Sequence, residues 1–118
     1  MSVQRLHIQQ RFSEIAISSN LVHLAGQLAS DTSLDITGQT RQTLEIIDQF
    51  LADAGTDKSH IMSVTIYLKD IERDYQDFNA VWDEWVSDIE ALPRTCVEAK
   101  LYHPDVLVEL TVVAVKPA

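Results

Sequence analysis

Two charged residues stand in C-terminal segments that otherwise have the composition of β-strands. Arg94 follows Pro93 in the segment 93–99, and Glu109 is the single charge in the apolar segment 106–115. A charge inside a sheet is costly unless it is paired, solvated or used to bind a ligand. Because Pro93 keeps the neighbouring chain extended, it presents the Arg94 guanidinium from a stiff support. This pair is therefore the first candidate for a functional site.

The residues alone leave two interpretations of the pair open. A direct salt bridge between Arg94 and Glu109 would make both residues structural. Alternatively, Arg94 could hold a small carboxylate, gaining about 1.5 to 3 kcal/mol per charged hydrogen bond. Strand periodicity places Arg94, Cys96 and Glu98 on one face of their strand and Glu109 on one face of the next. Whether these faces coincide depends on the strand register, which the sequence leaves undetermined.

Other nucleophiles and metal ligands are sparse. Cys96 is the only cysteine, so no intrachain disulfide can form, and no basic residue stands at a spacing that would activate its thiol. Its usual role would be a small core residue, although its backbone could contact a ligand at a strand end. The four histidines are isolated, without H-x-H or H-x-x-x-H spacing, and the three glycines form no phosphate loop. We therefore expect no metal site and no nucleotide bound by a standard phosphate loop.

Composition excludes several partners. The chain has 118 residues, which suits a single domain over residues 1–118, and its net charge is -9 with nine scattered basic residues. Nucleic acid and anionic membranes would be repelled at long range, whereas a small anion could still bind a local basic pocket. The N-terminus lacks the apolar core of a signal peptide, and no apolar run approaches the roughly 20 residues that span a bilayer. We expect a cytoplasmic protein without a membrane partner.

Hydrophobic periodicity predicts the elements that must position these residues. Strands are expected in residues 3–10, 14–18, 21–27, 61–68, 95–101 and 106–115. One helix is predicted from a cap at Thr37 to a stop at Gly55, and a second from Asp70 to Ile89. The second helix carries an aromatic stripe that indicates core packing, formed by Tyr75, Phe78, Trp82, Trp85, Val86 and Ile89. We summarise the order as β-β-α-β-α-β-β, an α+β fold with two helices on one face of a mixed sheet.

The last predicted strand is apolar on both sides. Val108, Leu110, Val112 and Ala114 share one side, whereas Leu107, Val113 and Val115 share the other. A strand buried on both faces needs cover on both, and two helices can cover only one face of a single sheet. We therefore expect the second face to meet another subunit in a homo-oligomer.

Seven short motifs, in order, resemble the RidA/YjgF family, small trimeric proteins that hydrolyse reactive enamines and imines released by pyridoxal-phosphate enzymes. The resemblance spans nearly the whole chain. The motifs are Gly26-Gln27, Gln39-Thr40-Arg41-Gln42, Ala54-Gly55, Val64-Thr65-Ile66-Tyr67-Leu68-Lys69-Asp70, Phe78-Asn79-Ala80-Val81-Trp82, Pro93-Arg94-Thr95-Cys96-Val97-Glu98-Ala99 and Val108-Glu109-Leu110.

The resemblance implies a chorismate-mutase-like fold whose three subunits pack their sheets into a central barrel. It also implies deamination of 2-imino acids such as 2-iminobutanoate and 2-iminopropanoate to 2-oxoacids and ammonia, a form of metabolite damage control. By this resemblance Arg94 would hold the substrate carboxylate in a cleft between subunits, and Glu109 would position water or shuttle a proton. Further substrate-binding positions would be Phe12, Ala25, Gly26, Asn79 and the backbone near Cys96. No metal or cofactor is implied.

Two residues depart from the family pattern. Phe12 stands where a tyrosine is common, and Ala25 where a serine is common, so two hydroxyl groups are missing from the expected site. These losses keep open an alternative, a non-catalytic protein that binds small carboxylates or regulates a partner on the same scaffold. An endoribonuclease or translation inhibitor, activities also ascribed to the family, is disfavoured by the net charge of -9.

Overall fold

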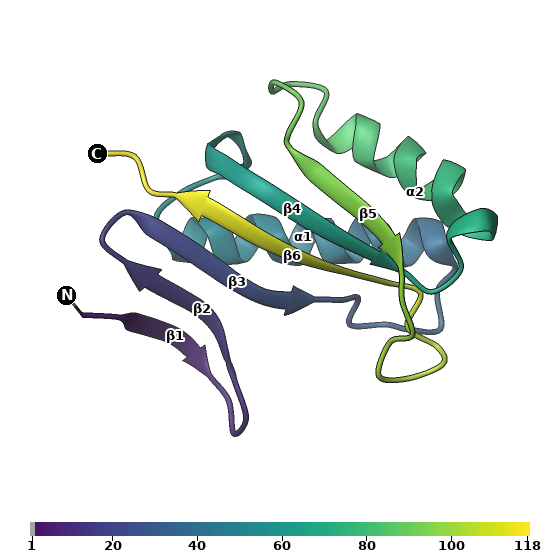
Figure 1. The fold of residues 1–118 in the computed structure, drawn as a ribbon, viewed down its shortest axis with the longest axis horizontal. Helices are drawn as coiled ribbons and strands as arrows, with labels where there is room; N and C mark the ends of the chain where they lie inside the picture. Colours follow the sequence, from purple (N-terminus) through teal and green to yellow (C-terminus); the bar gives the residue numbers. More distant parts are fainter. Residues whose placement is uncertain (1) are drawn as a thin grey trace.

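One six-stranded mixed sheet, with both helices on one of its faces, forms the protein (Figure 1). The structure, a computed structural model, describes residues 2–118. The strands are β1 (Gln4–Ile8), β2 (Ser13–Ser18), β3 (Leu21–Gln27), β4 (Ile61–Leu68), β5 (Arg94–Glu98) and β6 (Val108–Val115). The helices are α1 (Ile36–Asp53) and α2 (Ile71–Trp85), and a 3-10 turn, η1 (Lys58–His60), precedes β4.

The strand order is β1-β2-β3-β6-β4-β5, in which only the β4–β5 pair is parallel. The last strand, β6, therefore lies inside the sheet between β3 and β4, and β5 forms one edge. This arrangement confirms the predicted α+β class, with two helices on one face of a mixed sheet.

Several predicted boundaries are corrected. Three strands, not the two of the summarised order, precede α1, because the segment from Gln4 to Ile8 pairs with β2 as a separate edge strand. Helix α1 is capped by Asp35 rather than Thr37, since the Asp35 carboxylate accepts a hydrogen bond from the Gly38 N–H at 2.9 Å. Its end at Ala54, followed by Gly55 with a φ of 85°, agrees with the predicted stop.

Helix α2 ends at Trp85, four residues before the predicted Ile89. Ser87 donates both its backbone N–H and its hydroxyl to the Glu84 carbonyl, which competes with a further α-helical turn. The two C-terminal strands are also shorter than predicted, since β5 ends at Glu98 and β6 begins at Val108. Asp70 is the N-cap of α2, as expected at the helix entry.

The core lies between the sheet and the helices. Alternate residues of β6, Val108, Leu110, Val112 and Ala114, are buried with Ile47 and Leu51 of α1 and Phe78 of α2. Each such aliphatic or aromatic side chain stabilises the fold by about 1.5 to 3 kcal/mol relative to an exposed one. The predicted role of the aromatic stripe in the core is confirmed for Phe78 and Trp82, which are 0% and 4% exposed.

Within residues 2–118, no helix covers the other face of the sheet (Figure 1). Val113 and Val115 of β6 point to this face and are only half-buried, so β6 presents apolar side chains to both sides, as its pattern indicated. The homotrimer with a central barrel, which would cover this face, stays a prediction.

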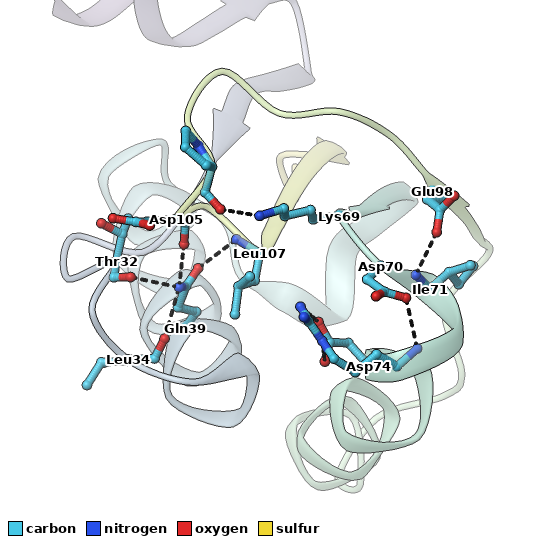
Figure 2. A network of polar contacts seen from close by, with 12 residues as sticks. Thr32, Leu34, Gln39, Lys69, Asp70, Ile71, Asp74, Glu98, Asp105 and Leu107 are labelled. Atoms are coloured by element: carbon cyan, nitrogen blue, oxygen red, sulfur yellow. Dashed lines mark hydrogen bonds and ion pairs between the residues drawn. The ribbon is translucent and has the colours of Figure 1, made fainter.

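A buried glutamine fixes the start of β6. Figure 2 shows the Gln39 side-chain amide near the carbonyl oxygens of Thr32, Leu34 and Asp105, at 3.2, 3.0 and 2.9 Å. Its Oε1 accepts a hydrogen bond from the Leu107 N–H at 3.0 Å. Because Gln39 belongs to α1 and is fully buried, it ties the loop before β6 to the helix layer. The position of Glu109, two residues beyond Leu107, depends on this attachment.

Candidate functional site

Arg94, the first residue of β5, extends beneath α2. Its Nη2 donates hydrogen bonds to the Asn79 side-chain oxygen at 2.7 Å and to the Tyr75 hydroxyl at 3.4 Å. The guanidinium carbon lies 6.0, 5.8 and 5.3 Å from the ring centroids of Tyr75, Phe78 and Trp82. Aromatic faces attract cations electrostatically, so these rings and the Asn79 amide hold the guanidinium in one orientation. The stripe that packs the core thus also supports the candidate site.

The Arg94 charge has no carboxylate partner. Among residues 2–118, no acidic side chain approaches it within ion-pair distance, and its Nη1 is a buried nitrogen without a hydrogen-bond partner. A partly buried cation of this kind is electrostatically unsatisfied and favours an incoming anion. Arg94 and Glu109 therefore form no salt bridge within the described chain.

Arg94 and Glu109 lie on opposite faces of the sheet within one chain. Strand β4 separates their strands, pairing Val64 with Arg94 and Tyr67 with Glu109. Val64 and Tyr67 are three residues apart and therefore point to opposite faces. Val64 is buried under the helices, so Arg94 is on the helix side and Glu109 is on the open side. One small ligand cannot touch both side chains of the same chain in this arrangement.

Glu109 sits against the backbone of Gly26. A Cβ added to Gly26 would lie 2.0 Å from Oε2 of Glu109, so glycine is the residue that leaves room for this carboxylate. Burial raises the pKa of Glu109 above its ordinary value of 4.5, and no hydrogen bond or nearby cation opposes this shift. A carboxyl group with a raised pKa holds its proton more tightly than an exposed glutamate does, which makes Glu109 a candidate for proton transfer.

A pocket of about 930 Å³ contains Glu109. It opens where the β1–β2 turn, the end of β3 and one side of α1 meet, and it is also lined by the predicted site residues Phe12, Ala25 and Gly26. Polar atoms in the pocket include the Glu14 carboxylate, which accepts a hydrogen bond from Gln27 at 3.2 Å. The structure thus brings together four of the seven predicted site residues.

The other three predicted residues form a second group around β5. Arg94 and Cys96 share the helix side of the sheet, and Asn79 contacts Arg94 directly. Burial raises the pKa of the Cys96 thiol above its ordinary 9.0, while the charge of Arg94 opposes this effect. The thiol is therefore protonated at neutral pH and is a poor nucleophile. Cys96 was expected to be a small core residue, and it packs against the core while staying partly exposed.

Sequence reasoning missed several residues of both groups. Tyr75 was assigned to the core stripe, yet it is 41% exposed and its hydroxyl reaches Arg94. Glu14 is a charge within a strand, the same signal that singled out Glu109, and it lines the same pocket. Tyr102, at the pocket mouth, belongs to an irregular loop whose position no local pattern could give.

Within residues 2–118 no cluster of three potential metal-ligating side chains occurs. In the same part of the chain, neither helix has the length and apolar character needed to cross a bilayer.

The contact between Gly26 and Glu109 can be tested with a double-mutant cycle. We expect Gly26→Ala to destabilise the parent protein only modestly, by up to about 1 kcal/mol, because its new methyl group meets the end of the flexible Glu109 side chain, which must turn away from its present position. In a Glu109→Ala background this contact is gone, so the same substitution should cost little. Urea unfolding of the four proteins measures both steps. Equal destabilisation in the two backgrounds would contradict the contact.

Three comparisons with known proteins agree on the family. The family model described as endoribonuclease L-PSP matches residues 2–116. A RutC family protein of Haemophilus ducreyi is 42% identical over 112 residues, 95% of each chain, and the RutC family protein YoaB of Escherichia coli is 34% identical over 97% of this chain and 98% of its own. A crystal structure of a YjgF-family protein from Neisseria meningitidis is 36% identical and superposes with a TM-score of 0.94, covering 100% of this chain and 98% of that one.

Proposed function

The chain belongs to the YjgF/RutC family, whose family model is described as endoribonuclease L-PSP, and from this membership we propose that it hydrolyses reactive 2-imino and 2-enamino acids in the cytoplasm. Water adds to the imine carbon, the carbon–nitrogen bond of the resulting carbinolamine breaks, and a 2-oxoacid and ammonia leave. Such a reaction needs an anchor for the substrate carboxylate and a group that moves protons.

The observation that carries the proposal is the uncompensated charge of Arg94. A guanidinium presents parallel N–H donors that match the two oxygens of a carboxylate. In this chain the guanidinium is held by Asn79 and three aromatic rings, and it has no acidic partner among the described residues. Because its orientation is fixed before the ligand arrives, little side-chain entropy is lost on binding.

Glu109 supplies the proton-transfer group in this proposal. The raised pKa of its carboxyl group allows it to give a proton to the departing nitrogen and to recover one from the attacking water. No other pocket carboxylate is equivalent, since Glu14 is engaged by Gln27.

The opposite orientations of Arg94 and Glu109 favour a site shared between two copies of the chain. We therefore place Arg94 of one copy and Glu109 of the next at opposite ends of one substrate, so that the substrate carboxylate is the partner of the guanidinium, in keeping with the expected cleft between subunits of a homotrimer. The half-buried apolar residues on the open face of β6 supply a surface for such an assembly. Mixing an Arg94→Ala protein with a Glu109→Gln protein should then restore part of the activity in hybrid oligomers.

The primary test is ammonia release from imines generated in situ. An amino-acid oxidase converts an amino acid to its imine, and the purified protein should accelerate the disappearance of the imine above its spontaneous hydrolysis. Light scattering of the same preparation measures the oligomeric state. Absence of any acceleration across several imines would overturn the proposed activity.

The second candidate is a non-catalytic binder of small carboxylates on the same scaffold. It is favoured by Phe12 and Ala25, because both line the Glu109 pocket without contributing a hydroxyl. Calorimetry with 2-oxoacids would then show saturable binding that depends on Arg94, while the imine assay shows no acceleration.

The name of the family model also suggests a ribonuclease. A net charge of -9 disfavours this function, because it repels RNA. RNA binding that persists at high salt would be needed to support it.

A further inference from the structure

We propose that the Glu109 pocket holds the side chain of the substrate, and that it selects imino acids with large apolar side chains over those with small or acidic ones. This inference rests on the proposed function, because it assigns the substrate class of the same site. It is carried by the size of the pocket, by its apolar walls and by the way its polar groups are satisfied.

The walls of the pocket are mainly aromatic and aliphatic. Phe12 and Tyr102 stand at its mouth, 52% and 79% exposed, and Leu28, Ile46 and Phe50 line it further. Its volume of about 930 Å³ is far more than a methyl or ethyl group can fill. A leucine- or phenylalanine-derived side chain would remove both its own apolar surface and that of the walls from water.

Most hydrogen-bond donors among the side chains around the pocket are already used within the chain. Gln27 donates to Glu14 at 3.2 Å, Ser30 to Gln42 at 3.2 Å, and Gln49 to Asp53 at 2.9 Å. The groups left for a ligand are mainly acceptor oxygens of Glu14, Gln27, Gln49 and Glu109, together with the exposed Tyr102 hydroxyl. Substrate side chains that must accept hydrogen bonds therefore gain little here.

The charge of the pocket also disfavours substrates with acidic side chains. No lysine or arginine is among the described residues that line the pocket, whereas Glu14 and Glu109 both contribute carboxyl groups. An aspartate- or glutamate-derived imine would bring its second carboxylate towards two acidic residues with no cation to offset it. The pocket should thus reject acidic side chains as well as gain little from small ones.

The expected preference can be measured as a ratio of kcat/KM values. Each additional buried methylene should raise kcat/KM about fourfold, so a leucine-derived imine should exceed an alanine-derived imine by roughly 10- to 60-fold. A glutamate-derived imine should react more slowly than the alanine-derived one. Equal or reversed values for the leucine- and alanine-derived imines would overturn the inference while leaving the proposed deaminase activity intact.

A charge substitution at the pocket mouth provides a matched comparison. Phe12→Arg places a cation at an exposed lining position, so the glutamate-derived imine should gain at least about tenfold in kcat/KM relative to the leucine-derived one. Ile8→Arg adds the same charge at a 70% exposed position of the same hairpin that does not line the pocket, and it should leave the ratio unchanged. Equal shifts in both variants would contradict a pocket effect.

Binding separates failure of this inference from failure of the proposed function. If no imine is hydrolysed, the proposed activity is wrong, but the affinities of the corresponding 2-oxoacids still decide the selectivity. Calorimetry should then give the leucine-derived 2-oxoacid a lower Kd than the alanine-derived one, and the glutamate-derived one the highest. Any other order overturns the inference independently of catalysis.

Discussion

Replacing Arg94 with alanine is expected to lower kcat/KM for imine hydrolysis by roughly 100- to 10,000-fold. Two charged hydrogen bonds to the substrate carboxylate, at about 1.5 to 3 kcal/mol each, give this range. The loss should be seen in KM and in kcat together, because the anchor both binds the substrate and orients it. Steady-state kinetics of ammonia release, with the parent protein at the same concentration, measures the effect.

Two further variants control for charge and for folding. Arg94→Lys keeps the positive charge but loses the two parallel N–H donors of the guanidinium. Its activity should therefore lie between that of Arg94→Ala and that of the parent. Arg5→Ala removes a basic residue from an exposed position of β1 and should leave kcat/KM unchanged. Thermal unfolding shows whether Arg94→Ala also loosens α2, whose rings pack on the guanidinium. An Arg94→Ala protein that folds and is as active as the parent would exclude the anchor role.

Local patterns were sufficient to predict most of the fold. The period-two alternation of β4 and the three- and four-residue spacing in α1 reflect burial of one face, which every helix or strand on a core must satisfy. The Thr37 cap and the Ile89 end were wrong for a shared reason. Helix ends are decided by single hydrogen bonds from side chains such as Asp35 and Ser87, and several nearby residues could equally have made them.

The site was predicted less completely than the fold. Charges within strands singled out Arg94 and Glu109 as candidates, but their orientation depends on pairing across β4, which links residues far apart in the sequence. The neighbouring residues in the sequence indicate neither the bulge between Leu24 and Gln27 nor the close approach of Gly26 to Glu109. A salt bridge between Arg94 and Glu109 within the chain, one of the two alternatives that the sequence left open, is excluded because β5 and β6 lie on either side of β4.

Gln39 shows how the core and the proposed site are coupled. Its amide connects α1 to the loop that carries Tyr102 and leads into β6, so the layer that stabilises the fold also sets the pocket mouth and the position of Glu109. A polar group this deeply buried is tolerated because all of its donors and acceptors are used. The pocket is thus supported from the helix side although Glu109 faces the open side of the sheet.

Glu109→Gln is expected to abolish most of the activity while stabilising the protein. General acid–base catalysis typically contributes 100- to 10,000-fold, so kcat should fall by about this factor. Burial raises the pKa of Glu109 above 4.5 in the folded protein, so the folded state binds its proton more tightly than the unfolded chain does. The free energy of unfolding therefore falls as the pH rises from 4.5 through the raised pKa of Glu109. Above that pKa the folded protein still bears the cost of burying the charged carboxylate.

The amide of Glu109→Gln carries no charge, so the variant should unfold at a higher urea concentration than the parent at pH 7, and this advantage should shrink as the pH is lowered towards 4.5. Glu45→Gln, at an exposed position of α1 outside the Glu109 pocket, should leave the activity unchanged. A loss of activity without a gain in stability would mean that the Glu109 carboxylate is satisfied in the assembled protein, by a partner or by solvent. A gain in stability with full activity would remove Glu109 from the mechanism, because a buried carboxyl group that costs stability and does no chemistry has no role in proton transfer.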